Sequence, residues 1–331
     1  MAEVYTRRRA IAILAAAAGL PLVTGAKSIE RFFTWTGQAL GAPATLILNH
    51  PDENAARRLI ERVVAEVARL ESVFSLYRAD SALAELNRVG VLVAPPAEMV
   101  SLLEASRGFW ELTGGTFDPS VQPLWVLYRN HFGMPEADPS GPSMKDIEPA
   151  LASVGFGGVR CDRDRIVIGA KMALTLNGVA QGFITDRIVD MLRDAGVTSS
   201  LVDMGEERTI GARPDGSPWR IGLADSQDSD RPDQVLEIVN KAVATSSASG
   251  FHFDEAGRLG HILDPRKGHV PSLYRRVTVI ADDAATADAL STAFTLMDED
   301  SIASIVKSRG DIAVDLLRLD DTHARRGSRM G

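Results

Sequence analysis

Helical and strand-type segments follow one another in irregular order along this chain. Apolar residues recur at helical spacing between Ala56 and Phe74, and a second helix is predicted over 97–112. Short runs bounded by Gly, Pro or Asp are typical of strands. They cover residues 201–204, 219–223, 235–239, 242–246, 276–280 and 312–317. Because there is no steady strand–helix–strand rhythm, the sequence favours an α+β fold over a doubly wound sheet.

Capping residues, glycines and prolines predict where several elements begin and end. A strand is expected over 44–48, and Asp52 can cap a helix that starts at Glu53. Gly114 and Gly115 stop the second helix, and residues 134–143 form a proline-rich surface loop. A short helix ends the segment 74–87. Further helices are predicted over about 179–195, closed by Gly196, and over 284–297 and 300–308. The polar residues 320–331 are expected to be a disordered tail.

The composition excludes several classes of protein. With 45% hydrophobic and 24% charged residues, the chain is neither intrinsically disordered nor a polytopic membrane protein. The net charge of −8 and the lack of a dense Lys/Arg block argue against nucleic-acid binding. Cys161 is the only cysteine, which excludes an intrachain disulfide and a cysteine-based zinc or iron–sulfur site.

The first 26 residues are predicted to be an export signal. Three arginines at 7–9 precede the short apolar run Ala10–Val23, and Thr24 and Ala26 suit a signal peptidase. The adjacent arginines favour the twin-arginine export machinery and a periplasmic location. An ordinary secretory signal or an uncleaved anchor remains the alternative. No cysteine follows the apolar run, so we do not expect a lipoprotein.

Two glycine-containing motifs interrupt the apolar segments. Thr113–Pro119 contains two glycines that let the backbone approach a ligand, although such a sequence is often just a turn. Asn177–Gly182 leads into a predicted helix, whose first N–H groups can face a phosphate. This second motif is neither a Walker A loop nor a dinucleotide-binding fingerprint.

Two further motifs carry side chains suited to chemistry. His261–Gly268 places a histidine, an aspartate and two cations within eight residues, which can serve an anionic substrate or form a solvated turn. Asp288 and Thr292 are four residues apart and share one face of a predicted helix. Their oxygens suit a hard cation such as Mg²⁺. The alternative is that the carboxylates of this segment only stabilise the start of the helix, where the helix dipole is positive.

Taken together and in order, these motifs resemble the ApbE family of FAD:protein FMN transferases. The resemblance runs from about Gly37 to Leu317. Its matching stretches are Leu40–Ala42, Phe74–Tyr77 with Ser81 and Leu86–Asn87, Gly114–Pro119, Asn177–Gly182 with Asp186, Val202–Gly205, Ser246–Gly250, His261–Pro265 with Gly268, and Ala287–Thr292. The resemblance implies an ApbE-type, T-fold-like mixed domain over 34–319, with the FAD site in a central cleft.

The resemblance also implies a reaction and a set of site residues. Family members are exported and use Mg²⁺ to transfer the FMN half of FAD to a Thr or Ser of an acceptor protein, releasing AMP. The implied metal ligands are Asp288, Thr292 and the carbonyl of Gly178, and the implied catalytic residues are His261, as the base, and Asp288. The implied FAD-binding residues are Leu40, Tyr77, Thr116, Phe117, Asp118, Thr175, Gln181, His261 and Ile262.

Some positions depart from the commoner family pattern. Gln181 stands where many members have Lys or Glu, Thr175 where Asp is frequent, and Leu40 where Met is usual. Gln181 and Met204-Gly-Glu look similar to the branch linked with nitrous oxide respiration, often called NosX. The acceptor is then expected to be a periplasmic flavoprotein domain of the nitrous oxide reductase system. Two alternative functions are an FAD pyrophosphatase, which hydrolyses FAD to FMN and AMP, and a non-catalytic FAD-binding maturation factor.

Overall fold

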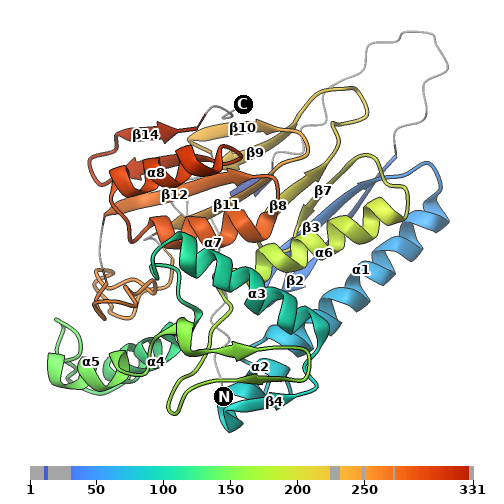
Figure 1. Ribbon diagram of the computed structural model, residues 1–331. Coiled ribbons are helices and arrows are strands. Elements are labelled where there is room, and N and C mark those ends of the chain that lie inside the picture. Colours follow the sequence, from blue (N-terminus) through green and yellow to red (C-terminus); the bar gives the residue numbers. More distant parts are fainter. Residues whose placement is uncertain (1–10, 14–30, 224–231, 248–249, 271–272, 328–331) are drawn as a thin grey trace.

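The fold is built on an eight-stranded sheet in which every neighbouring pair of strands is antiparallel (Figure 1). The computed structural model describes residues 11–13, 31–223, 232–247, 250–270 and 273–327. The strand order is β14-β13-β12-β11-β8-β7-β3-β2. The strands are β2 (Phe32–Ala39), β3 (Ala42–Asn49), β7 (Ser200–Asp203), β8 (Glu207–Ile210), β11 (Ala242–Ser247), β12 (Tyr274–Ala281), β13 (Ala313–Arg318) and β14 (His323–Arg326).

Helices cover one face of this sheet and enclose the larger hydrophobic core (Figure 1). They are α1 (Glu53–Phe74), α2 (Ala82–Val89), α3 (Ala97–Leu112), α6 (Ala180–Asp194), α7 (Ala284–Phe294) and α8 (Glu299–Arg309). Leu70 of α1, Ile188 of α6 and Leu290 of α7 are fully buried there. Because these apolar faces meet the same side of the sheet, the core fixes where each helix lies.

Two small sheets and a helical pair complete the structure. The strands β9 (Trp219–Leu223) and β10 (Gln234–Ile238) pair with each other, and their apolar side chains pack with Val243 and Ile280 in a second core. The strands β4 (Val91–Val93), β5 (Arg160–Cys161) and β6 (Arg165–Val167) form the other sheet. The helices α4 (Gln122–Phe132) and α5 (Met144–Leu151) lie to one side of the molecule (Figure 1). The single-turn helices are Pro119–Val121 and Phe156–Gly158.

Local sequence signals account for much of this arrangement. The Asp52 carboxylate accepts the Ala55 N–H at 2.9 Å and caps α1, as predicted. The expected helices over 97–112 and 179–195 correspond to α3 and α6, and the two expected near the C-terminus correspond to α7 and α8. All six predicted strand runs of the second half are strands. The prediction of a mixed α+β fold is therefore confirmed.

The C-terminal segment differs from the sequence prediction. Residues 320–331 were expected to be disordered, but His323–Arg326 form β14, paired with β13. Ala324 is buried, His323 lies 2.8 Å from the buried Asp315, and Arg326 pairs with Glu299. A polar strand is stabilised here by cross-strand pairing and ion pairs rather than by hydrophobic pattern. Residues 328–331 lie outside the described residues.

The predicted signal segment lies almost entirely outside the described residues. Within it only Ile11–Ile13 are described, as the short strand β1, which pairs with β9. The twin-arginine pair and the expected cleavage site are not among them. In the described parts of the chain, no helix combines the length and hydropathy of a membrane span.

The backbones of α6 and α7 touch at Gly182. A Cβ atom on Gly182 would lie 2.3 Å from the Ala284 carbonyl oxygen and 2.8 Å from the Ala285 Cα. Real Cβ atoms do not approach backbone so closely, and backbone cannot rotate away as a side chain can. The contact therefore requires glycine at this position and sets the separation of the two helices.

We expect Gly182→Ala to destabilise the fold by about 1–3 kcal/mol, because the added methyl group forces α6 and α7 apart. Chemical unfolding monitored by circular dichroism measures this. Gly108→Ala is the matched control, since Gly108 lies in α3 with open space around its Cβ position. That substitution is expected to stabilise the helix by roughly 0.5–1 kcal/mol. Equal stability of Gly182→Ala and the wild type would contradict the required backbone contact.

Candidate functional site

A single pocket collects motifs that are far apart in the sequence. Its wall is formed by the turn after α1, the glycine-containing loop before α4, the loop before α6, the end of β11, the loop 250–265 and one face of α7. The lining residues are Leu76, Tyr77, Thr116–Pro119, Val121, Gln122, Trp125, Arg129, Thr175, Asn177, Gly178, Thr245–Ser247, Gly250, Phe251, His261–Leu263, Pro265, Asp288, Thr292 and Leu296. This set includes every predicted site residue except Leu40 and Gln181.

One corner of the pocket brings together Asp288, Thr292 and Gly178. Asp288 and Thr292 lie one turn apart on α7, and both face the pocket together with Gly178. A Cβ atom on Gly178 would lie 3.1 Å from the Thr292 hydroxyl, so the backbone at Gly178 approaches that side chain closely. Carboxylate, hydroxyl and carbonyl oxygens are ligands that Mg²⁺ accepts, and Mg²⁺ usually adds waters and substrate phosphates.

The Asp288 carboxylate is held in a defined orientation. It is 2% exposed, and one of its oxygens accepts the Gly182 N–H at 3.1 Å. The Ser246 and Ser291 hydroxyls are 2.8 Å apart and link β11 to the same helix. Across the described residues there is no cluster of three or more His, Cys, Asp or Glu side chains suited to a metal ion. The corner around Asp288 therefore offers a partial oxygen shell rather than a complete metal cage.

His261 lies on the wall of the same pocket. Its Nδ1 is 3.0 Å from the Phe251 carbonyl oxygen. A carbonyl only accepts, so Nδ1 is the donor, and in the neutral ring the lone pair is then on Nε2. A Cβ atom on Gly250 would lie 2.7 Å from the His261 Cε1, so the histidine ring packs directly against that glycine. The ring is thus fixed both in position and in tautomer.

Asp118 lines the pocket, but its carboxylate organises the surrounding loops. One oxygen accepts from the N–H and the hydroxyl of Ser120 at 2.8 and 2.5 Å. The other accepts from the Trp110 indole and the Phe156 N–H, both at 3.1 Å. Four donors already converge on this carboxylate, so the structure gives Asp118 a role in shaping the pocket wall. The contact of Asp118 with the flavin nucleotide stays a prediction.

The neighbouring threonines differ in how their polar groups are used. The Thr175 N–H donates to the Pro119 carbonyl at 2.7 Å and joins two of the pocket loops. The Thr116 hydroxyl is buried and has no hydrogen-bond partner in the described part of the chain. Buried polar atoms are nearly always paired, so Thr116 is a position where a ligand atom or water would supply the partner. Phe117, Tyr77 and Ile262 add apolar surface to the wall.

Leu40 and Gln181 are not among the described residues that line the pocket, and their role in FAD binding stays a prediction. Gln181 is 3% exposed, and its amide nitrogen lies 3.4 Å from the Ala39 carbonyl. A Cβ atom on Gly205 would lie 2.3 Å from that same nitrogen. Gln181 therefore packs between the β2–β3 turn and Gly205, and the Leu40 N–H donates to Glu71 at 2.7 Å.

The helix α4 contributes to the pocket, which the sequence motifs did not predict. Trp125 and Arg129 of this helix line the pocket, and the Arg129 guanidinium lies 5.5 Å from the Trp125 ring centroid. Arg129 is the only lysine or arginine among the described residues that line the pocket. The sequence does carry a helical signal here, since Leu124 and Tyr128 are four residues apart, and the structure buries both.

Comparisons with known proteins show which family this chain is similar to. The family model described as ApbE family matches residues 40–315. A curated relative from Vibrio cholerae, named FAD:protein FMN transferase, is 26% identical over 320 residues, which are 93% of this chain and 94% of the relative. A relative of the same name from Treponema pallidum is 30% identical over 273 residues, 74% of this chain and 73% of the relative.

Solved structures show the same fold. The apo flavinyl transferase ApbE of Pseudomonas stutzeri superposes with a TM-score of 0.75 at 26% identity, covering 90% of this chain and 96% of that one. The ApbE protein of Thermotoga maritima gives a TM-score of 0.78 at 27% identity, covering 89% and 97%. With a family model matched over most of its length and the motif residues gathered in one pocket, this chain belongs to the ApbE family.

Proposed function

We propose that this chain is an FAD:protein FMN transferase that uses Mg²⁺ and modifies a Thr or Ser hydroxyl of an acceptor protein. Its family makes it an enzyme of the transferase class, and curated relatives carry this activity in their names. The observation that carries the proposal is the meeting of Asp288, Thr292 and Gly178 with His261 around one pocket. One wall of the pocket thus carries both the oxygen corner and a histidine that is hydrogen-bonded through Nδ1.

The residues present fit a magnesium ion. Asp288 and Thr292 would hold it through side-chain oxygens, and Gly178 through its carbonyl. The fit rests on the absence of a side chain at Gly178, where a Cβ atom would crowd the Thr292 hydroxyl at 3.1 Å. When bound, Mg²⁺ supplies positive charge for the diphosphate of FAD. The Gly182 N–H keeps the Asp288 carboxylate turned toward α6.

The transfer we propose is a single displacement at phosphorus. The acceptor hydroxyl oxygen attacks the phosphorus of the FMN half, and the bond from that phosphorus to the bridging oxygen breaks. AMP leaves with the bridging oxygen, and a phosphoester joins FMN to the acceptor. The hydroxyl proton passes to Nε2 of His261, which is the ring nitrogen that carries the lone pair when Nδ1 donates to Phe251.

We further propose that the protein is exported by the twin-arginine route and acts in the periplasm. The arginines at 7–9 and the apolar run that follows them support this. Gln181 and the Met204-Gly-Glu turn favour the NosX-like branch, whose acceptor would be a flavoprotein of the nitrous oxide reductase system. In the structure these positions are neighbours, since Gln181 packs on Gly205.

The decisive experiment incubates residues 27–331 with FAD, Mg²⁺ and a periplasmic acceptor domain. A denaturing gel viewed under ultraviolet light detects covalent flavin, and a separate assay measures AMP. We expect a fluorescent acceptor band with an equal amount of AMP, both lost with EDTA. AMP without a band, across a panel of acceptor domains, would indicate an FAD pyrophosphatase. Bound FAD without either product would indicate a maturation factor.

We expect Asp288→Ala to abolish Mg²⁺-dependent transfer, because it removes the only carboxylate of the oxygen corner. Thr292→Val should reduce transfer strongly, whereas Thr292→Ser, which keeps the hydroxyl, should retain most of it. Initial rates of acceptor labelling at several Mg²⁺ concentrations measure these effects. Full activity of Asp288→Ala would remove this residue from the metal site.

We expect His261→Ala to lower the transfer rate by about 10²–10⁴-fold, the usual contribution of a general base. FAD affinity should change much less, because the ring occupies only part of the pocket wall. Single-turnover labelling measures the rate, and quenching of flavin fluorescence measures binding. Equal losses of rate and of FAD affinity would make His261 a binding residue.

A further inference from the structure

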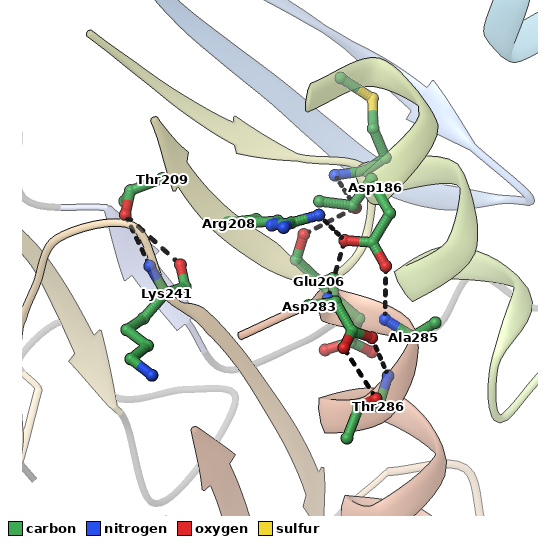
Figure 2. Close-up of polar contacts among 11 residues, drawn as sticks. Asp186, Glu206, Arg208, Thr209, Lys241, Asp283, Ala285 and Thr286 are labelled. Atoms are coloured by element: carbon green, nitrogen blue, oxygen red, sulfur yellow. Dashed lines mark hydrogen bonds and ion pairs between the residues drawn. The ribbon is translucent and has the colours of Figure 1, made fainter. Parts of the chain in front are cut away.

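Asp186 joins the two helices that carry the oxygen corner. It lies on α6, one turn after Gly182, and Figure 2 shows its carboxylate reaching toward both Arg208 and the start of α7. One carboxylate oxygen accepts the Ala284 N–H at 2.8 Å, and the other accepts the Ala285 N–H at 2.9 Å. These are the first two N–H groups of α7, which have no acceptor within their own helix.

The start of α7 is therefore capped from two sources. Its own preceding residue, Asp283, accepts the Thr286 N–H at 2.7 Å, as an ordinary N-cap does (Figure 2). The two N–H groups before it are taken by Asp186 from a different helix. A negative charge at a helix N-terminus is favourable because the helix dipole is positive there. Asp186 thus caps the start of α7 and at the same time attaches it to α6.

A second contact, one turn further along, runs in the opposite direction. The Gly182 N–H of α6 donates to the Asp288 carboxylate of α7 at 3.1 Å. Between the two contacts, the backbones meet at the Cβ-free surface of Gly182. Asp186 and Asp288 therefore form a reciprocal pair, each carboxylate accepting N–H groups of the other helix. A shift of one contact must shift the other, because a single turn of rigid helix separates the two contacts on α6, and likewise on α7.

Arg208 holds the Asp186 carboxylate in place. Its Nη1 lies 2.6 Å from the carboxylate oxygen that also accepts the Ala284 N–H. The Asp186 and Arg208 side chains are 15% and 11% exposed. Burial raises the pKa of Asp186 to about 6, although Arg208 and the Ala284 N–H lower it, so the carboxylate is still mostly ionised at neutral pH.

We propose that Asp186 is a positioning residue that sets the metal affinity of the site, by fixing α7 and its Asp288 and Thr292 against the Gly178 end of α6. It touches neither substrate nor metal and acts through Ala284 and Ala285. The inference rests on the proposed function, because it assumes the cation at Asp288 and Thr292. Groups that orient metal ligands from the next layer typically change metal affinity by about 10- to 100-fold.

The test is a titration of Mn²⁺, followed by electron paramagnetic resonance, into the protein saturated with FAD. FAD alone serves as the blank. We expect Asp186→Asn to raise the Kd for Mn²⁺ by about 10- to 100-fold, because it loses the charge and one of the two acceptors. FAD affinity measured without metal should be unchanged. Asp186→Glu keeps the charge but moves the oxygens by one methylene, so we expect an intermediate loss of metal affinity.

The matched control is Asp298→Ala. Asp298 caps α8, where it accepts the Ser301 N–H at 2.8 Å, and it is not among the residues that line the pocket. This variant should lower thermal stability without changing the Kd for Mn²⁺. Wild-type affinity in both Asp186 variants would overturn the proposal, as would an equal loss in Asp298→Ala. If Asp186→Asn does not fold, Asp186→Glu decides the result.

The outcomes also separate this proposal from the proposed function. Flavin transfer by the wild type together with unchanged Mn²⁺ binding in the Asp186 variants would overturn the positioning role alone. A wild type that binds FAD but no Mn²⁺ would overturn both the metal site and the role of Asp186. Weakened Mn²⁺ binding in the variants of a wild type that does not transfer flavin would support the positioning role and contradict only the transferase reaction.

Discussion

The contact between α6 and α7 is the constraint on which the site depends. Two backbones can lie this close only where one of them lacks a side chain, and Gly182 provides that surface. The closeness lets carboxylates on each helix reach N–H groups on the other. It also brings the loop before α6, with Gly178, to the face of α7 that bears Thr292. The oxygen corner is therefore a consequence of helix packing, and the eight-stranded sheet behind it keeps both helices in place.

Hydrogen bonds of polar side chains fix the rest of the pocket wall. A buried carboxylate must find donors, and Asp118 finds them on Trp110, Ser120 and Phe156, which lie in three different segments. Satisfying this one side chain thus ties the glycine-containing loop to the segment around 155–158. The His261 ring is fixed in the same way by the Phe251 carbonyl. For Asp118 the hydrogen bonds are required by burial, and for both residues they also set the geometry of the pocket wall.

The sequence was most informative where local chemistry decides the structure. Asp52 and the apolar spacing behind it predicted α1, and the motif residues His261, Asp288 and Thr292 do meet in one pocket. Elements that depend on distant partners were missed. The helix α4 packs its Leu124 and Tyr128 against an aromatic cluster from residues 251–263, and β14 is held by pairing with β13. The loop-organising role of Asp118 was hidden for the same reason, since all four of its donors lie outside the motif Thr113–Pro119, and those on Trp110 and Phe156 belong to other elements.

The charges of the pocket bear on the proposed use of Mg²⁺ with the substrate. A substrate carrying a diphosphate brings two negative charges into a chain whose net charge is already −8. Among the described residues that line the pocket, Arg129 is the only permanent cation, and it lies on the Trp125 ring. Asp288 adds a further negative charge at the oxygen corner. Electrostatics therefore favours diphosphate and divalent ion entering together, each lowering the cost of burying the other.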